Sequence, residues 1–309
     1  MSVVNRVINP LVGGIRNELM HLIEALENQS SISTKAQAAS KPSNPHPSIV
    51  ALHGIVPIYA KALSRYTTTA TAQTALASFF ISLIWRGLVA LSHRPCPPPS
   101  PPASPSPMYF GNKKRRGSPA SSSPQLPPST SRFTIKGPPS RPPSPLLLHG
   151  PSSPHSDARA LYDLLNLLPR PTANKESTRL AREAVDEAFD GLIALYTFLE
   201  GIQLTNQGSQ GEGELVDHLA MLSADLPTLI ALPPLLRVYG ANSSGVFPVV
   251  ASMIGLSEDE YRNGCLAGFG RAEECAAAVG GRLLSILRAD PNTANGVVAK
   301  WLEVEISDA

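Results

Sequence analysis

The feature that most constrains this chain is a proline- and serine-rich segment that divides it in two. Residues 95–154 contain 19 of the 31 prolines and 13 serines, which together make up more than half of these 60 residues. Proline lacks a backbone N–H donor and few apolar side chains here could be buried, so folding could not recover the entropy lost on ordering. We therefore predict an extended, disordered linker with folded parts on both sides.

Charge is also divided between the two sides. Residues 1–156 hold 15 basic and 3 acidic groups, a formal +12, whereas residues 157–309 hold 11 basic and 21 acidic groups, a formal −10. Charge of one sign over a long stretch affects partner choice rather than fold. The basic half is suited to an acidic protein surface, an anionic membrane or nucleic acid, and the density of cations leaves nucleic acid undecided. The acidic half of the same chain is itself a suitable intramolecular partner.

Apolar spacing predicts helices throughout the flanks, so the expected fold class is all-α. We expect a small helical region at 1–94 with a short linker at 28–47, the basic Pro/Ser-rich linker at 95–156, and an acidic helical bundle at 157–309. Asn9 and Pro10 are the expected N-cap and first residue of the first helix, and Asp157 is the expected cap of the helix after the linker. Further helices are expected near 48–66, where Pro57 would end or kink the helix, 70–92, 174–203, 214–223, 227–238, 245–255, 257 onward, 271–288 and 292–305.

Two helices allow more than one interpretation. The stripe at 181–202 repeats at alternating gaps of four and three, which suits either a bundle helix or an intermolecular coiled coil, and Phe189, Ile193 and Tyr196 widen it in favour of a bundle. Residues 66–85 carry no charge, so 70–92 could anchor the protein in a membrane. The strongly apolar run from Ala75 to Trp85 is only 11 residues long, and Arg86 follows it, which favours a buried core helix.

The sharpest short motif lies inside the predicted linker. Four adjacent cations there are similar to a single-cluster nuclear import signal, in which Lys and Arg side chains engage an import receptor. Plain solubilising charge and contacts to phosphate groups are the alternatives. The four residues, which we name the basic cluster, are Lys113, Lys114, Arg115 and Arg116.

Six Ser-Pro steps surround the basic cluster and are candidate sites for a proline-directed kinase. The best candidate follows Arg115 and Arg116 almost directly, and a phosphate there would add a charge of about −1.5 to −2 next to the four cations and mask them. Chance pairs in a Pro/Ser-rich composition are the alternative explanation. The six serines are Ser104, Ser106, Ser118, which is the best candidate, Ser123, Ser144 and Ser153.

A third motif in the linker matches the ligands of SH3 domains. Lys136 precedes Pro139 and Pro142, which suits a polyproline helix that offers two prolines to aromatic grooves and a cation as an anchor. Such spacing also arises by chance in proline-rich sequence.

Signs of catalysis are absent from the sequence patterns. Cys265 and Cys275 lie ten residues apart and Cys96 is remote, so we expect neither a zinc site nor a redox pair. The glycines at 264, 268 and 270 follow no strand and do not form a phosphate-binding loop. We expect no cofactor, no bound metal and no enzymatic activity, although catalytic groups could still converge from distant positions.

Together these patterns predict a non-enzymatic regulatory or adaptor protein of the nucleus or of nucleus and cytoplasm. The C-terminal helical domain would bind protein partners, while the linker would engage an import receptor and a proline-directed kinase. The alternative is a membrane-associated helical adaptor anchored through residues 70–92.

Overall fold

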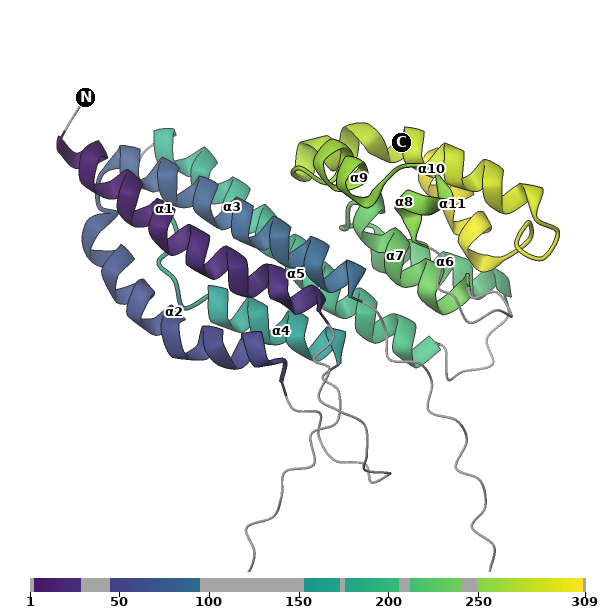
Figure 1. The fold of residues 1–309 in the computed structure, drawn as a ribbon, viewed down its shortest axis with the longest axis horizontal. Coiled ribbons are helices and arrows are strands. Elements are labelled where there is room, and N and C mark those ends of the chain that lie inside the picture. The colour runs from purple at the N-terminus through teal and green to yellow at the C-terminus, as the bar shows by residue number, and fades with distance from the viewer. Residues whose placement is uncertain are drawn as a thin grey trace, which may run out of the picture. The chain divides into compact units, whose positions relative to one another are not determined.

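Every regular element in the described part of the chain is helical. The computed structural model describes residues 3–28, 45–94, 153–172, 176–205, 212–240 and 249–307, and contains no strand among them (Figure 1). The all-α prediction is confirmed, while the predicted linker falls almost wholly outside the described residues. The helices are α1 (Val3–Glu24), η1 (Ala25–Glu27), α2 (Pro47–Tyr66), α3 (Ala70–His93), α4 (Pro154–Leu165), α5 (Glu176–Thr205), α6 (Glu212–Ser223), α7 (Thr228–Tyr239), α8 (Val250–Met253), α9 (Glu258–Cys265), α10 (Phe269–Ala289) and α11 (Val297–Ser307).

Several predicted helix boundaries differ from the structure. The starts expected near 245 and 292 lie at Val250 and Val297, and three further differences involve two prolines and Asp157. Helix α1 begins at Val3 and runs through Pro10, because the apolar stripe continues back to the buried Ile8 while the proline ring faces outward. Helix α2 likewise continues through the exposed Pro57. Helix α4 begins at Pro154, so Asp157 lies inside its first turn instead of capping it. Apolar burial outweighs the lost backbone hydrogen bond at Pro10.

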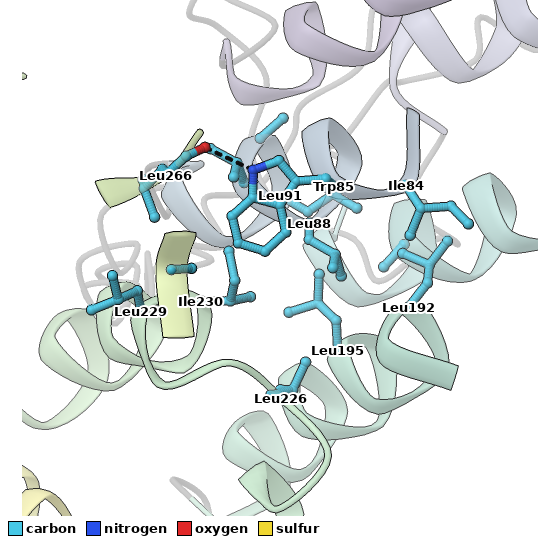
Figure 2. Close-up of a cluster of buried hydrophobic side chains, with 14 of the residues drawn as sticks. Ile84, Trp85, Leu88, Leu91, Leu192, Leu195, Leu226, Leu229, Ile230 and Leu266 are labelled. Carbon is cyan, nitrogen blue, oxygen red and sulfur yellow. Dashed lines mark hydrogen bonds between the residues drawn. The ribbon is translucent and has the colours of Figure 1, made fainter. Parts of the chain in front are cut away.

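Helix α3 is the centre of the hydrophobic core. It packs most extensively against α5 and α1, and it also contacts α7, η1 and α4. Figure 2 shows Trp85, Leu88 and Leu91 of α3 beside Leu229 and Ile230 of α7, and all five side chains are almost completely buried. The core is therefore built by residues from both sides of the predicted linker.

The two flanks of the linker accordingly form one compact unit. Residues Met1–Cys96 and His149–Ala309 group together, whereas the sequence interpretation placed 1–94 and 157–309 in separate folded parts. The physical reason lies in α3, whose buried residues occur on nearly every side of the helix. Helices α1 and α2 cannot cover all of that surface, and α5 and α7 cover the rest.

The long helix α5 lies in this bundle. Its heptad-like stripe is buried against helices of its own chain, mainly α3 and α4, rather than left free for a second copy. Phe189 belongs to the same core and contacts the rings of Phe80 and Tyr162. The bundle interpretation of this helix therefore agrees with its burial.

Candidate functional site

Most residues that the sequence singled out lie outside the described residues. These are the basic cluster Lys113, Lys114, Arg115 and Arg116, the serines Ser104, Ser106, Ser118, Ser123 and Ser144, and the polyproline candidates Lys136, Pro139 and Pro142. The structure does describe the two positions where the segment that carries them leaves and re-enters the helical unit. These positions, at Arg94 and Ser153, lead to the candidate site.

A buried ion pair joins the two ends of that segment. The Arg94 Nη1 donates to the Asp157 Oδ2 at 2.5 Å, and the two side chains are only 4% and 1% exposed. Arg94 caps the C-terminus of α3, and Asp157 lies in the first turn of α4. Because a buried charge is costly without a partner, this pair holds α3 and α4 together at the point where residues 95–152 leave and return.

The same carboxylate also binds the start of α2. The backbone N–H of His46 donates to the Asp157 Oδ1 at 3.0 Å, so each oxygen of Asp157 accepts a hydrogen bond. The His46 ring Nε2 lies 2.9 Å from the carbonyl oxygen of Asn28, and its Nδ1 accepts from the backbone N–H of Ser48 at 3.2 Å. We name Arg94, Asp157, His46 and Asn28 the anchor.

The anchor joins the ends of two segments. Asn28 and His46 flank residues 29–44, while Arg94 and Asp157 flank residues 95–152. Three helices and η1 therefore meet at one hydrogen-bonded cluster. The polar side chains of His46, Arg94 and Asp157 are buried, and their hydrogen bonds require all four chain ends to be in place. The anchor therefore fixes where both segments begin and end.

His46 is uncharged in this arrangement. Because Nδ1 accepts a hydrogen bond, the ring proton lies on Nε2 and is donated to the Asn28 carbonyl. Burial lowers the pKa of His46 below its ordinary value, and the nearby Arg94 cation lowers it further, against the raising effects of Asn28 and Asp157. A neutral ring is the form that fits both contacts, so protonation would weaken the anchor.

Ser153 is the candidate phosphorylation site that the structure describes. It is the N-cap residue of α4, with extended backbone angles, but its side chain makes no capping hydrogen bond. Its Oγ contacts the His155 Nδ1 at 2.5 Å and accepts from the Gln203 Nε2 at 3.3 Å. The hydroxyl is half-buried, and it lies on the same first turn as Asp157.

A second histidine, which is half-buried, lies next to the anchor. The Nδ1 of His93 lies 3.0 Å from the carbonyl oxygen of Val89, whereas its buried Nε2 has no hydrogen-bond partner among the described residues. Burial lowers the pKa of His93 to about 3, and the cations of Arg262 and Arg237 lower it as well. His93 is therefore neutral around pH 7, and its ring faces that of Tyr261 with centroids 6.3 Å apart.

A further ion pair joins η1 to α9. Arg262 donates to both carboxylate oxygens of Glu27, with the Nη1 contact at 2.9 Å, and its Nε donates to Glu258 at 2.7 Å. Although burial opposes it, hydrogen bonds to these two carboxylates raise the pKa of Arg262. Here the acid comes from the basic half and the cation from the acidic half, so the contact between the halves does not follow their net charges.

Two further properties of the described residues concern metal binding and membrane crossing. Within the described ranges, no group of three or more His, Cys, Asp or Glu side chains is placed to hold a metal ion.

Helix α3 is the one described helix that is long and apolar enough to cross a membrane by length and composition, with a mean hydropathy of 1.7. However, 67% of that stretch is buried inside the protein.

Sequence reasoning missed the anchor and one pair of thiols. Arg94 directly precedes the proline run and Asp157 is the first acidic residue after Glu27, so both carried a signal, but their pairing depends on the packing of α3 against α4. Cys265 and Cys275, which were not expected to be a redox pair, lie close together across the connection between α9 and α10, where the Cys275 Sγ is 3.8 Å from the carbonyl oxygen of Gly264.

The comparisons with known proteins give no relative. No protein-family model, no curated protein and no solved structure matches this chain.

Proposed function

We propose that this chain is a non-enzymatic adaptor protein in which the helical unit presents the segment at 95–152 to protein partners. The observation that carries the proposal is the buried pair of Arg94 and Asp157, which holds the two ends of the segment together. A segment fastened at both ends by a buried ion pair stays attached to one place on the helical unit. Its motifs are then held at a high local concentration beside any partner of that unit.

The motifs of the segment suggest the kinds of partner. The basic cluster suits an import receptor, since several adjacent cations can engage acidic grooves. The residues around Lys136, Pro139 and Pro142 suit an SH3 domain. The Ser-Pro steps suit a proline-directed kinase, whose product at Ser118 would place negative charge beside the cluster. The proposed location is the nucleus, or both nucleus and cytoplasm.

Localisation of full-length variants tests the import function. Replacing Lys113, Lys114, Arg115 and Arg116 by alanine should lower the nuclear fraction of a tagged protein several-fold. The matched control replaces Arg132, Lys136 and Arg141, which are cations of the same segment outside the cluster. If the cluster variant and the control distribute like the unchanged protein, the import function is wrong.

Regulation by phosphate has its own test. Ser118→Asp should reduce nuclear accumulation relative to Ser118→Ala if a negative charge masks the cluster. Equal localisation of the two variants would contradict masking while leaving import itself intact.

An array of SH3 domains tests the polyproline motif. Binding is compared between the unchanged protein and a variant with Pro139→Ala and Pro142→Ala.

A further inference from the structure

Two free thiols meet where α9 connects to α10. Cys265 is the last residue of α9 and is 9% exposed, while Cys275 lies on the second turn of α10 and is half-buried. The Cys275 Sγ lies 3.8 Å from the carbonyl oxygen of Gly264, the residue directly before Cys265. That carbonyl belongs to the peptide bond that joins Gly264 to Cys265, so the Cys275 sulfur lies beside the Cys265 residue. The turn after α9 therefore brings the two cysteines close together.

A cation lies beside this pair. The Arg271 Nε donates to the same Gly264 carbonyl oxygen at 2.7 Å, so its guanidinium lies beside the Cys275 thiol that contacts this oxygen. Burial raises the pKa of the Cys265 thiol, and the neighbouring Cys275 raises it further. Cys275 is the more exposed of the two, so an oxidant from solution reaches it first.

We propose that Cys265 and Cys275 are a redox pair that forms an intramolecular disulfide when the protein meets a peroxide. The Cys275 thiolate attacks one oxygen of hydrogen peroxide, the O–O bond breaks, and the released hydroxide takes up the thiol proton as water. The resulting sulfenic acid is attacked at sulfur by Cys265, the S–O bond breaks, and a second water leaves with the Cys265 proton. The two thiols lose two electrons and the peroxide gains them.

The oxidised pair would act on the core through the next residue. The carbonyl oxygen of Leu266 accepts a hydrogen bond from the Trp85 Nε1 at 2.7 Å, as Figure 2 shows. Trp85 belongs to α3, and its ring also contacts Phe269 at the start of α10, with centroids 4.7 Å apart. A disulfide directly before Leu266 fixes the short connection that holds this carbonyl, so the environment of Trp85 reports the redox state.

Thiol counting in the full chain tests the pair. With Cys96→Ser as the background, Cys265 and Cys275 are the only thiols. Treatment with hydrogen peroxide should remove both alkylatable thiols, leave a monomer that has lost two hydrogen atoms, and be reversed by dithiothreitol. Adding Cys265→Ser should instead leave Cys275 as a trappable sulfenic acid. The proposal is overturned if the two-thiol protein keeps both thiols, accumulates sulfenic acid at Cys275, or forms only intermolecular disulfides.

Tryptophan fluorescence tests the effect on α3. The chain has two tryptophans, so Trp301→Phe leaves Trp85 as the single reporter. Peroxide should shift its emission in the two-thiol background, dithiothreitol should restore it, and the Cys265→Ser variant should show no such reversible shift. Unchanged emission upon disulfide formation would contradict the coupling to α3. Neither result depends on the adaptor function, which rests on residues 95–152.

Discussion

Arg94 and Asp157 are 63 residues apart in sequence and form an ion pair at 2.5 Å in the interior of the protein. Each belongs to a different side of the proline-rich segment, and each is within a few residues of it. The backbone N–H of His46 donates a hydrogen bond to the other oxygen of the Asp157 carboxylate. The helical unit is thus closed at the place where the segment leaves and returns.

A double-mutant cycle measures this closure. Asp157→Leu should destabilise the protein by about 3–5 kcal/mol, because it leaves the buried guanidinium of Arg94 without this carboxylate. Adding Arg94→Leu should recover part of the loss, so the two effects should not add. Urea denaturation gives the free energies of unfolding. Additive losses of free energy would contradict the buried pair. As a control, Arg179→Ala removes an exposed ion pair and should not change the free energy of unfolding measurably.

Two serines at helix N-cap positions should differ in how much stability is lost when each is replaced by alanine. Ser257 accepts from the backbone N–H of Glu260 in a capping box at the start of α9, so Ser257→Ala should cost about 1 kcal/mol. Ser153 precedes α4 without a capping hydrogen bond, so Ser153→Ala should lie within about 0.5 kcal/mol of the unchanged protein. Chemical denaturation compares the two, and equal losses would show that the two N-termini do not differ as described.

The free energy of unfolding should fall in acid because the pKa values of His46 and His93 are lowered in the folded protein. The folded pKa of His93 is about 3 and that of His46 is also lowered from 6.5, so the unfolded chain binds more protons below pH 6.5. The contribution of the two neutral histidines to the free energy of unfolding is complete above pH 6.5. It declines as the pH falls from 6.5 toward their pKa values in the folded protein. For His93 alone the loss at pH 5 is about 2 kcal/mol.

The pH effect can be assigned by substitution. His93→Gln should flatten the dependence of the unfolding free energy between pH 7 and pH 5, even if its stability at pH 7 is lower. The exposed His53 serves as the control, and His53→Gln should leave the dependence unchanged. An unaltered slope in His93→Gln would contradict the assignment.

Membrane anchoring through residues 70–92 leads to a different expectation. Inserting α3 into a bilayer would require its buried face to leave α1, α5 and α7, at the cost of the shared core. We therefore expect carbonate extraction of cell membranes to release the full-length protein into the supernatant. Pelleting that resists carbonate and is lost on deleting residues 75–91 would favour the anchor instead.

Local patterns predicted most helices but not how they join. The apolar stripes gave the positions of α3, α5 and α10 to within a few residues, because periodicity reports which face of a helix is buried. Periodicity does not report what covers that face. The uncharged run at residues 66–85 therefore allowed a membrane span beside the favoured core helix, and the sequence did not show that α5 and α7 pack against it.

The candidate site was less accessible from the sequence for the same reason. From the sequence alone, Arg94 was one cation of the basic half and Asp157 was the expected cap of a helix. The residues next to either one in the sequence do not indicate that the two form an ion pair. Cys265 and Cys275 lacked any recognised spacing, and their proximity arises from the short connection between α9 and α10. Long-range contacts of this kind follow from packing, which a single sequence does not display.

Cleavage of the intact protein inside the proline-rich segment tests the central claim most directly. A site for a specific protease, inserted between Pro97 and Leu148, allows the folded chain to be cut into two pieces. If the flanks share one core around α3, the two pieces should elute together in gel filtration and unfold in a single transition. Pieces that separate under native conditions would contradict the single helical unit and the anchor that closes it.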